Sequence, residues 1–370
     1  MSGDLSREAS SLTPELAASI ESLLDAAAVS ANRSLVRRLL TTSLLLGMDD
    51  TERLDLKISA AALDEMHDAF RLFAPFAALP KVSVFGSART QVDDPLYQRA
   101  QAVAKALAAD GWMVVTGAGP GIMQAAAEGA GPERSIGVSI RLPFEESPNE
   151  MLPEPNVVSM KYFFTRKLML MKESKGFVCL PGGFGTLDEM FELLTLQQTG
   201  KAEPMPIVLL DEPGGTFWMG LRHFIEQHLV PAGVIAADDF ERVLITDSVK
   251  AAALEVTRFW HNYNSLRWVG DRLVLRLNTA PTAAEVEQLN ERFGFMVAQG
   301  RIERTEALPV ERRDGDLVEL PRLVLTLVPR QVGELHRLIS AINELDSAQG
   351  LTSRSADDRE QHPAPTHPVL

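Results

Sequence analysis

The sequence predicts an α/β protein built around a doubly wound, Rossmann-like parallel sheet between about residues 80 and 263. Two observations predict this fold. Short apolar runs alternate with amphipathic segments, and continuous apolar strands joined by crossover helices are typical of parallel sheets buried on both faces. Glycines also follow three of the apolar runs, as they do at the ligand-binding edge of such sheets.

A helical segment is expected ahead of the sheet, over residues 1–79. Apolar residues recur there at helical spacing, as in Leu63, Met66 and Phe70, and Pro75 interrupts the pattern. No motif with obvious chemistry stands out in this segment. We therefore expect it to cover the sheet or to pack against a second subunit.

The α/β domain, residues 80–263, is predicted to alternate between strands and helices. The strands are expected at 81–85, 112–116, 135–140, 176–180, 206–210 and 242–245. The helices are expected near 95–110, 120–130, 162–174, 186–199, 216–230 and 247–262.

Residues 264–346 are predicted to form a small α+β module, ferredoxin-like in outline. The remaining residues, 347–370, are rich in Ser, Asp, Gln, Pro and His and are expected to be a disordered tail. The expected order in the module is strand 272–277, helix 282–299, strand 302–310, a turn at 312–315, strand 322–328 and helix 332–345.

Composition excludes several classes of function. The chain has 36 Lys+Arg against 50 Asp+Glu, and a net charge of -14 disfavours nucleic acid and anionic lipid as partners. Its single cysteine, Cys179, cannot form an internal disulfide, and the seven histidines are scattered, so no metal site is expected. Without a signal pattern or a membrane-length apolar run, we expect a cytoplasmic protein with no membrane partner.

Three expected strand ends carry glycines, and glycines there let backbone amides at the next helix start approach a phosphate closely. Because the carboxyl ends of parallel strands share one edge of the sheet, we expect the three loops to line one crevice. The residues expected to bind a substrate there are Gly86, Ser87 and Arg89 in the first loop, Thr116, Gly117, Gly119 and Gly121 in the second, and Gly182, Gly183, Gly185 and Thr186 in the third.

Structural alternatives exist for each of these signals. The second loop is not a dinucleotide fingerprint, because Ile122 stands where the pattern requires glycine, and its glycines could form only a tight turn. Thr186 and Glu189 have the spacing of a capping box, which would satisfy helix-start amides and nothing more. The pair Arg166-Lys167 could belong to a solvated helix face.

The pair Arg166-Lys167, combined with the string Pro-Gly-Gly-Phe-Gly-Thr-Leu-Asp-Glu at 181–189, resembles the LOG (lonely guy) family, long labelled "lysine decarboxylase-like". The resemblance covers about residues 81–261. It implies a homo-oligomeric enzyme that hydrolyses nucleoside 5′-monophosphates, or cytokinin riboside monophosphates, to free base and ribose 5-phosphate. It also implies that Arg166 and Glu189 are catalytic, while the glycine loops and Thr186 hold the phosphate.

For this chemistry Glu189 would stabilise the positive charge that develops on the ribose, and Arg166 would orient Glu189 and the substrate. Lys167 would screen the phosphate, and Asp188 is the alternative carboxylate. No cofactor is expected, because nothing points to the Schiff-base lysine that a pyridoxal-dependent decarboxylase needs.

Two questions stay open at this point. Small plant-type members carry Met-His near the Arg-Lys pair, where this chain has Phe163-Phe164-Thr165, and these rings could stack on a base, pack in the core or meet a partner. A carrier that binds a nucleotide or molybdenum cofactor without cleaving it could also use this fold. The presence of both Arg166 and Glu189 favours hydrolysis.

Overall fold

The structure is a computed structural model that describes residues 12–141, 154–236 and 239–349. The chain divides into two compact units, Met1–Asp64 and Glu65–Leu370, and the boundary falls within one helix. The division into 1–79, 80–263, 264–346 and 347–370 stays a prediction.

The first unit is helical. It contains α2 (Pro14–Ala26), α3 (Arg33–Met48) and the beginning of α4 (Arg53–Phe73). Thr13 caps α2 by accepting a hydrogen bond from the amide of Leu16, and Pro14 takes the first helical position, where its missing N–H has no cost. Arg33 at the start of α3 forms ion pairs with the carboxylates of Glu21 and Asp25 on α2.

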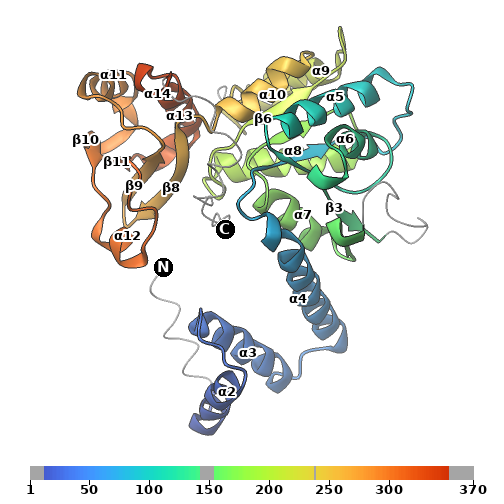
Figure 1. The fold of residues 1–370 in the computed structure, drawn as a ribbon, viewed down its shortest axis with the longest axis vertical. Helices are drawn as coiled ribbons and strands as arrows, with labels where there is room; N and C mark the ends of the chain where they lie inside the picture. The colour runs from blue at the N-terminus through green and yellow to red at the C-terminus, as the bar shows by residue number, and fades with distance from the viewer. Residues whose placement is uncertain (1–11, 142–153, 237–238, 350–370) are drawn as a thin grey trace. The chain divides into compact units, whose positions relative to one another are not determined.

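The second unit contains a seven-stranded sheet in which every neighbouring pair is parallel, as predicted (Figure 1). All six predicted strands are present within one or two residues, and β4 was not predicted. The strand order is β4-β3-β2-β1-β5-β6-β7, so it reverses between β1 and β5. The strands are β1 (Lys81–Phe85), β2 (Met113–Thr116), β3 (Ser135–Ile140), β4 (Val157–Met160), β5 (Phe177–Cys179), β6 (Ile207–Leu210) and β7 (Val243–Thr246).

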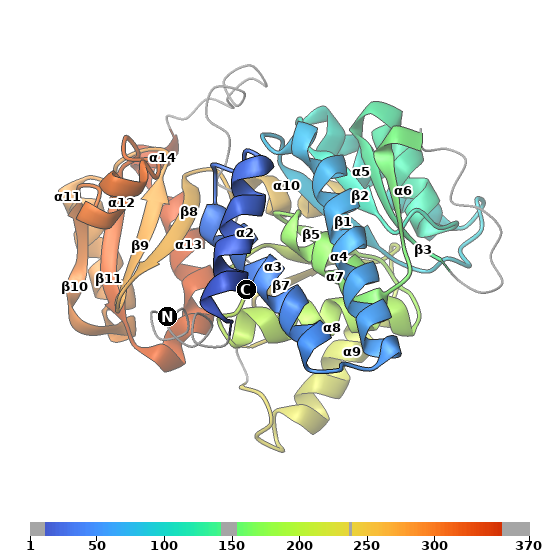
Figure 2. The ribbon, with the colours of Figure 1, turned by 90° about the horizontal axis from the view of Figure 1, so that it is seen from below.

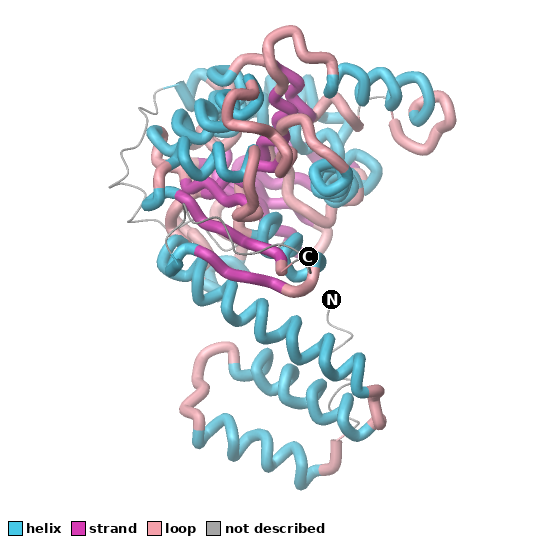
Figure 3. Tube along the Cα trace, turned by 90° about the vertical axis from the view of Figure 1, so that its right-hand side faces the viewer, coloured by secondary structure: helices cyan, strands magenta, loops and turns pink. Residues whose placement is uncertain are grey.

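Helices cover both faces of this sheet, and Figure 3 shows the strands in magenta between them. The end of α4 packs on one face with α7, α8 and α9, while α5, α6 and α10 pack on the other. Because strand side chains alternate, Val115 and Phe177 join the first core and Val114 and Val178 the second. The helices are α5 (Pro95–Ala109), α6 (Ile122–Ala130), α7 (Phe163–Lys172), α8 (Phe184–Gln198), α9 (Phe217–Phe224) and α10 (Val249–Arg258).

A four-stranded antiparallel sheet follows, in the order β10-β11-β9-β8, and Figure 2 shows it with α11 and α13. Since β11 lies between the parallel strands β9 and β10, the β9-α11-β10 unit is the split βαβ of a ferredoxin-like fold. The fourth strand is β8, which precedes the module's predicted first strand. The elements are β8 (Tyr263–Val269), β9 (Arg272–Leu277), α11 (Ala283–Phe293), β10 (Val297–Thr305), α12 (Pro309–Asp314), β11 (Arg322–Leu327), α13 (Leu335–Asn343) and α14 (Asp346–Gln349).

Several boundaries in this module differ from the prediction. Helix α11 ends at Phe293 and a strand begins at Val297, so the helix expected over 282–299 was too long. The turn expected at 312–315 is mostly the helix α12, which Pro309 begins at its first position. Residues 346–349 form α14, and the rest of the predicted tail, 350–370, lies outside the described residues.

Candidate active site

The three glycine loops meet at one edge of the parallel sheet. They follow β1, β2 and β5, which are adjacent strands, at the point where the strand order reverses. Backbone contacts join them: the amide of Ser87 donates to the carbonyl of Pro181 at 3.3 Å, and the amide of Ile122 donates to the carbonyl of Ser87 at 3.0 Å. The expected convergence of the loops is therefore present, and such switch points are where α/β sheets bind ligands.

Some of these glycines have a steric reason to be glycine. A Cβ on Gly86 would lie 2.5 Å from Cγ2 of Ile122, and one on Gly119 would lie 2.6 Å from Cε of Met123. Gly121 has a φ of +68°, and its Cβ would lie 2.4 Å from the carbonyl oxygen of Ser87. The tight-turn alternative thus accounts for part of the glycine signal in the second loop, and close packing against Ile122 accounts for Gly86 in the first.

The polar side chains of the first two loops help to shape them. The hydroxyl of Ser87 accepts a hydrogen bond from the amide of Arg89, and the hydroxyl of Thr116 accepts one from the amide of Ala118. Thr116 is buried, whereas Arg89 is exposed. Both hydroxyl oxygens therefore accept hydrogen bonds from amides of their own loops, and the Arg89 side chain lies at the surface.

The third loop leads into α8, which begins at Phe184 with Gly183 as its N-cap residue. The N-cap residue Gly183 has no side chain to cap this helix, and Thr186 lies inside the first turn. The capping-box alternative for Thr186 and Glu189 is therefore wrong, because the helix starts earlier than that alternative requires. The first-turn amides of an α-helix have no intrahelical acceptor, and they attract anions. A Cβ on Gly183 or Gly185 would meet nothing within 4 Å, so these two glycines leave the helix start open.

Glu189 lies one turn further along α8 and is only 8% exposed. Its Oε2 atom has no hydrogen-bond partner in the described part of the chain. Burial raises the pKa of Glu189 from its ordinary 4.5 to about 7, although the positive charges of Lys167 and Arg166 oppose that shift. A buried carboxyl whose pKa lies near neutrality is typical of a functional site.

Arg166 lies on α7 and reaches the carboxyl edge of the sheet. Its Nε donates to the carbonyl of Val138 at 2.9 Å, and its Nη2 donates to the carbonyl of Gly117 at 3.3 Å. The guanidinium packs directly against Gly117, because a Cβ on that residue would lie 1.9 Å from Nη2 of Arg166. Arg166 is therefore not on a solvated helix face. Its positive charge lowers the pKa of Glu189, which opposes the effect of burial on that carboxyl.

Lys167 is also engaged. Its Nζ lies 2.6 Å from a carboxylate oxygen of Asp188 and 2.6 Å from one of Glu192, which links α7 to α8. The Lys167 side chain is only 15% exposed, so it does not lie on a fully solvated helix face. Its ion pairs direct the ammonium group toward α8 carboxylates next to Glu189.

Phe163 and Phe164 are 59% and 55% exposed, so neither is a core residue of this chain. They line a groove of about 460 Å³ between α7 and α8. The Lys167 ion pairs form its polar part, and its other lining residues are Leu168, Met171 and Leu196. Base stacking and contact with a partner are the two roles that stay open for the phenylalanines.

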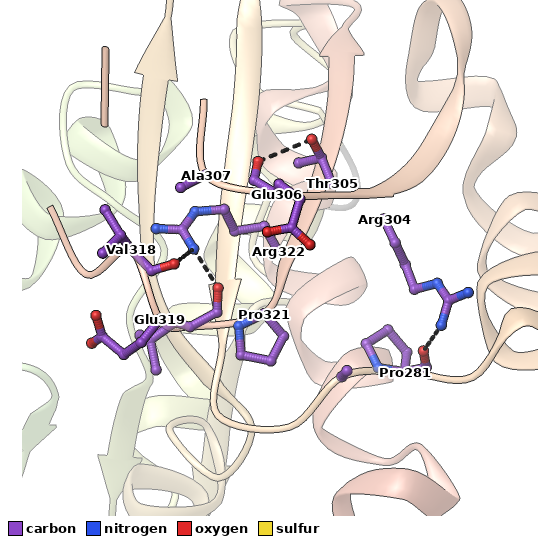
Figure 4. A pocket seen from close by; sticks show the side chains of 11 residues that line it. Pro281, Arg304, Thr305, Glu306, Ala307, Val318, Glu319, Pro321 and Arg322 are labelled. Carbon is purple, nitrogen blue, oxygen red and sulfur yellow. Dashed lines mark hydrogen bonds between the residues drawn. The ribbon is translucent and has the colours of Figure 1, made fainter. Parts of the chain in front are cut away.

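A separate hollow of about 470 Å³ lies in the C-terminal module (Figure 4). Its arginines are held by main-chain carbonyls: Arg322 donates to those of Val318 and Leu320, and Arg304 donates to that of Pro281. Over the described ranges, no group of three or more His, Cys, Asp or Glu side chains is arranged to hold a metal. No helix within those ranges is both long and apolar enough to span a bilayer.

Comparisons with known proteins agree with the motifs at this edge. Residues 121–256 match the family model described as "Possible lysine decarboxylase". A Mycobacterium tuberculosis protein named cytokinin riboside 5′-monophosphate phosphoribohydrolase is 32% identical over 161 residues, which are 42% of this chain and 83% of the relative. A Mycobacterium marinum protein of the same name is 30% identical over the same shares of the two chains.

Among solved structures, the molybdenum cofactor carrier protein of Chlamydomonas reinhardtii is 22% identical, with a TM-score of 0.35. The match covers 49% of this chain and 97% of the carrier. A third sequence relative, the cytokinin riboside 5′-monophosphate phosphoribohydrolase LOG of Oryza sativa, is 29% identical over 36% of this chain and 53% of its own length. With one relative matched at 32% identity over most of its length, and with the Arg-Lys pair and the 181–189 string at one sheet edge, this chain belongs to the LOG family.

Proposed function

We propose that the chain hydrolyses the N-glycosidic bond of nucleoside 5′-monophosphates, releasing the free base and ribose 5-phosphate. The observation that carries this proposal is the buried Glu189 carboxyl, whose Oε2 makes no hydrogen bond within the described residues and on which the charge of Arg166 acts. The names of the relatives support it, since these proteins are called cytokinin riboside 5′-monophosphate phosphoribohydrolases.

The phosphate would bind to main-chain amides at the loop edge. The first-turn amides of α8 suit an anion, and the open Gly183 and Gly185 would let it approach. The other residues proposed to bind the substrate are those expected from the sequence: Gly86, Ser87, Arg89, Thr116, Gly117, Gly119, Gly121, Gly182 and Thr186.

Cleavage breaks the bond between C1′ of the ribose and the base nitrogen, and the bonding electrons leave with the base. The ribose then carries positive charge, which a carboxylate beside C1′ stabilises more in the transition state than in the ground state. The oxygen of a water molecule bonds to C1′, and Glu189 accepts the proton that this water loses. The departing base nitrogen takes up a proton from the solvent, and Glu189 then releases its proton to the solvent, so the enzyme returns to its starting state. A pKa of about 7 suits a group that accepts a proton near neutral pH.

Arg166 and Lys167 have different parts in this scheme. Arg166 holds the second glycine loop through the Gly117 carbonyl and favours the ionised form of Glu189. Lys167 is bound by Asp188 and Glu192, so we assign it an electrostatic effect on Glu189 in addition to the screening of the phosphate.

The catalytic domain in this proposal is 80–263, and 264–346 is an appended module. We also propose a cytoplasmic homodimer or larger homo-oligomer that binds no nucleic acid. The net charge of -14 supports the last point, and the exposed Phe163 and Phe164 side chains offer an apolar surface for a second copy.

The test is incubation of the purified full chain with AMP, GMP, CMP and UMP, followed by chromatography of the released base and assay of ribose 5-phosphate. The proposal expects stoichiometric base and ribose 5-phosphate from at least one nucleotide, and loss of both products in Arg166→Ala. Tight nucleotide binding without any product would contradict hydrolysis and favour the non-catalytic carrier.

A further inference from the structure

Helix α7, which carries Arg166, has no cap of its own. Tyr162 occupies the N-cap position without a capping side chain, and the first turn contains no acidic residue. The amides at the start of a helix need acceptors, especially where water is excluded. The two amides just before this turn, those of Lys161 and Tyr162, and the Thr165 hydroxyl within it find an acceptor in a distant part of the sequence.

Glu65, on the part of α4 that belongs to the second unit, supplies it. One carboxylate oxygen accepts a hydrogen bond from the amide of Lys161 at 2.7 Å. The other accepts from the hydroxyl of Thr165 at 2.6 Å and from the amide of Tyr162 at 3.4 Å. Glu65 is only 5% exposed, so three donors and the positive end of the helix compensate for a buried negative charge.

The same turn of α7 carries Arg166. Its own amide donates to the carbonyl of Tyr162 at 3.2 Å, and the Thr165 hydroxyl, which shares its one proton between Glu65 and this carbonyl, lies 2.9 Å from the carbonyl oxygen. Glu65 therefore binds the peptide units that fix where the first turn of α7 begins. From that turn the guanidinium reaches the carbonyls of Val138 and Gly117.

We propose that Glu65 is a positioning residue, which sets the start of α7 and thereby places the Arg166 guanidinium at the carboxyl edge of the sheet. Its effect on catalysis rests on the proposed function, whereas its effect on the place of Arg166 does not. A role limited to stability would leave Arg166 in place in the fraction of molecules that fold.

Glu65→Gln is the most direct variant. It keeps the shape of the side chain but turns one acceptor into an NH₂ group, which faces the amide of Lys161 in one orientation and the amide of Tyr162 in the other, so one backbone donor loses its acceptor. Thr165→Val and Thr165→Ser form a second pair, because only serine keeps the hydroxyl. Asp68→Asn, an exposed position on the same helix, is the matched control.

The first readout is the crystal structure of Glu65→Gln. We expect the first turn of α7 to shift and the Arg166 contact with the Val138 carbonyl, 2.9 Å in the wild type, to be lost. An unchanged Arg166 in Glu65→Gln would overturn the inference. If Glu65→Gln does not fold, the crystal structure of Thr165→Val is determined instead, with that of Thr165→Ser as its control.

The second readout is kinetic. A displacement of about 1 Å in a catalytic site can cost about 10²-fold in rate, so we expect kcat to fall by about 10- to 10²-fold in Glu65→Gln and by less in Thr165→Val. Asp68→Asn and Thr165→Ser should retain the wild-type kcat. A wild-type kcat in both Glu65→Gln and Thr165→Val would overturn the inference.

The pH profile separates positioning from simple loss of folded protein. The charges acting on Glu189 are those of Arg166 and Lys167, which lower its pKa, and of Asp188 and Glu192, which raise it. If Arg166 moves away from the site, a positive charge that lowers the pKa of Glu189 is lost. The acid limb of the plot of kcat against pH should therefore move to higher pH. A lower rate with an unmoved limb would show a structural role only. If the wild type cleaves no nucleotide, the proposed function fails, and the crystal structure still decides the place of Arg166.

Discussion

Glu189→Gln tests both the chemistry and the energetics of the site. Burial raises the pKa of Glu189 from 4.5 to about 7, so the folded protein keeps a proton that the unfolded chain releases over this range. At ~1.36 kcal/mol per pKa unit, the full difference corresponds to about 3 kcal/mol. The sign is definite: the folded state loses this stability as the pH rises from about 4.5 through about 7.

The variant has no carboxyl to titrate at this position, so this part of the pH dependence should disappear. We expect the difference in unfolding free energy between variant and wild type to change by about 2–3 kcal/mol in favour of the variant between about pH 5 and pH 8. Urea unfolding at the two pH values measures it. Because the comparison is between pH values, any constant cost of the buried amide cancels. In parallel, the rate of nucleotide cleavage should fall by about 10²–10³-fold.

Two results would refute this reasoning. If the stability difference between variant and wild type is the same at both pH values, Glu189 does not have a raised pKa in the folded protein. If Glu189→Gln cleaves AMP at nearly the wild-type rate, the carboxylate does not stabilise the transition state.

Three further predictions follow from the same contacts. Gly117→Ala should lower kcat by about 10²-fold, because its Cβ would lie 1.9 Å from Nη2 of Arg166 and must displace it; steady-state kinetics measure this. Lys167→Met should move the acid limb of the pH–rate profile to higher pH, since the lysine charge lowers the pKa of Glu189. Glu311→Gln should destabilise the C-terminal module by about 3–5 kcal/mol in urea unfolding, because this fully buried carboxylate pairs with two buried arginines.

Each of these has a control with the same chemical change at an uninvolved position. Gly220→Ala meets nothing within 4 Å, Lys172→Met removes a charge at the far end of α7, and Glu287→Gln removes an exposed ion pair. Wild-type kcat in Gly117→Ala, an unmoved limb in Lys167→Met, or equal stability losses in Glu311→Gln and Glu287→Gln would contradict the respective prediction.

The parallel sheet could be predicted because its strands are apolar on both faces and are separated by helix-length segments. Strand β4 was missed because Val157–Met160 is short and lies at the edge of the sheet, with one exposed position in the middle of its pattern. Strand β8 was missed because Tyr263–Val269 begins only four residues after α10 and lacks a continuous apolar run. The length of α11 was overestimated because apolar residues continue through 294–297, where the chain passes from a 3₁₀ turn into β10.

The site was predictable where its residues are close in sequence. The loop at 181–189 and the pair at 166–167 are continuous strings, and their convergence follows from parallel strand order. The start of α8 was misjudged because Thr186 and Glu189 have cap spacing, while glycines at 182, 183 and 185 gave no signal for the earlier turn. Glu65 could not be found from the sequence, because a carboxylate that caps a helix almost one hundred residues away leaves no local pattern.

The most direct test of the proposed site is a crystal structure of Glu189→Gln with AMP bound. We expect the phosphate on the amides at the start of α8 and on the glycine loops, C1′ of the ribose beside residue 189, and the guanidinium of Arg166 at the same edge of the sheet. AMP bound elsewhere, or bound with its ribose turned away from residue 189, would contradict the proposed site.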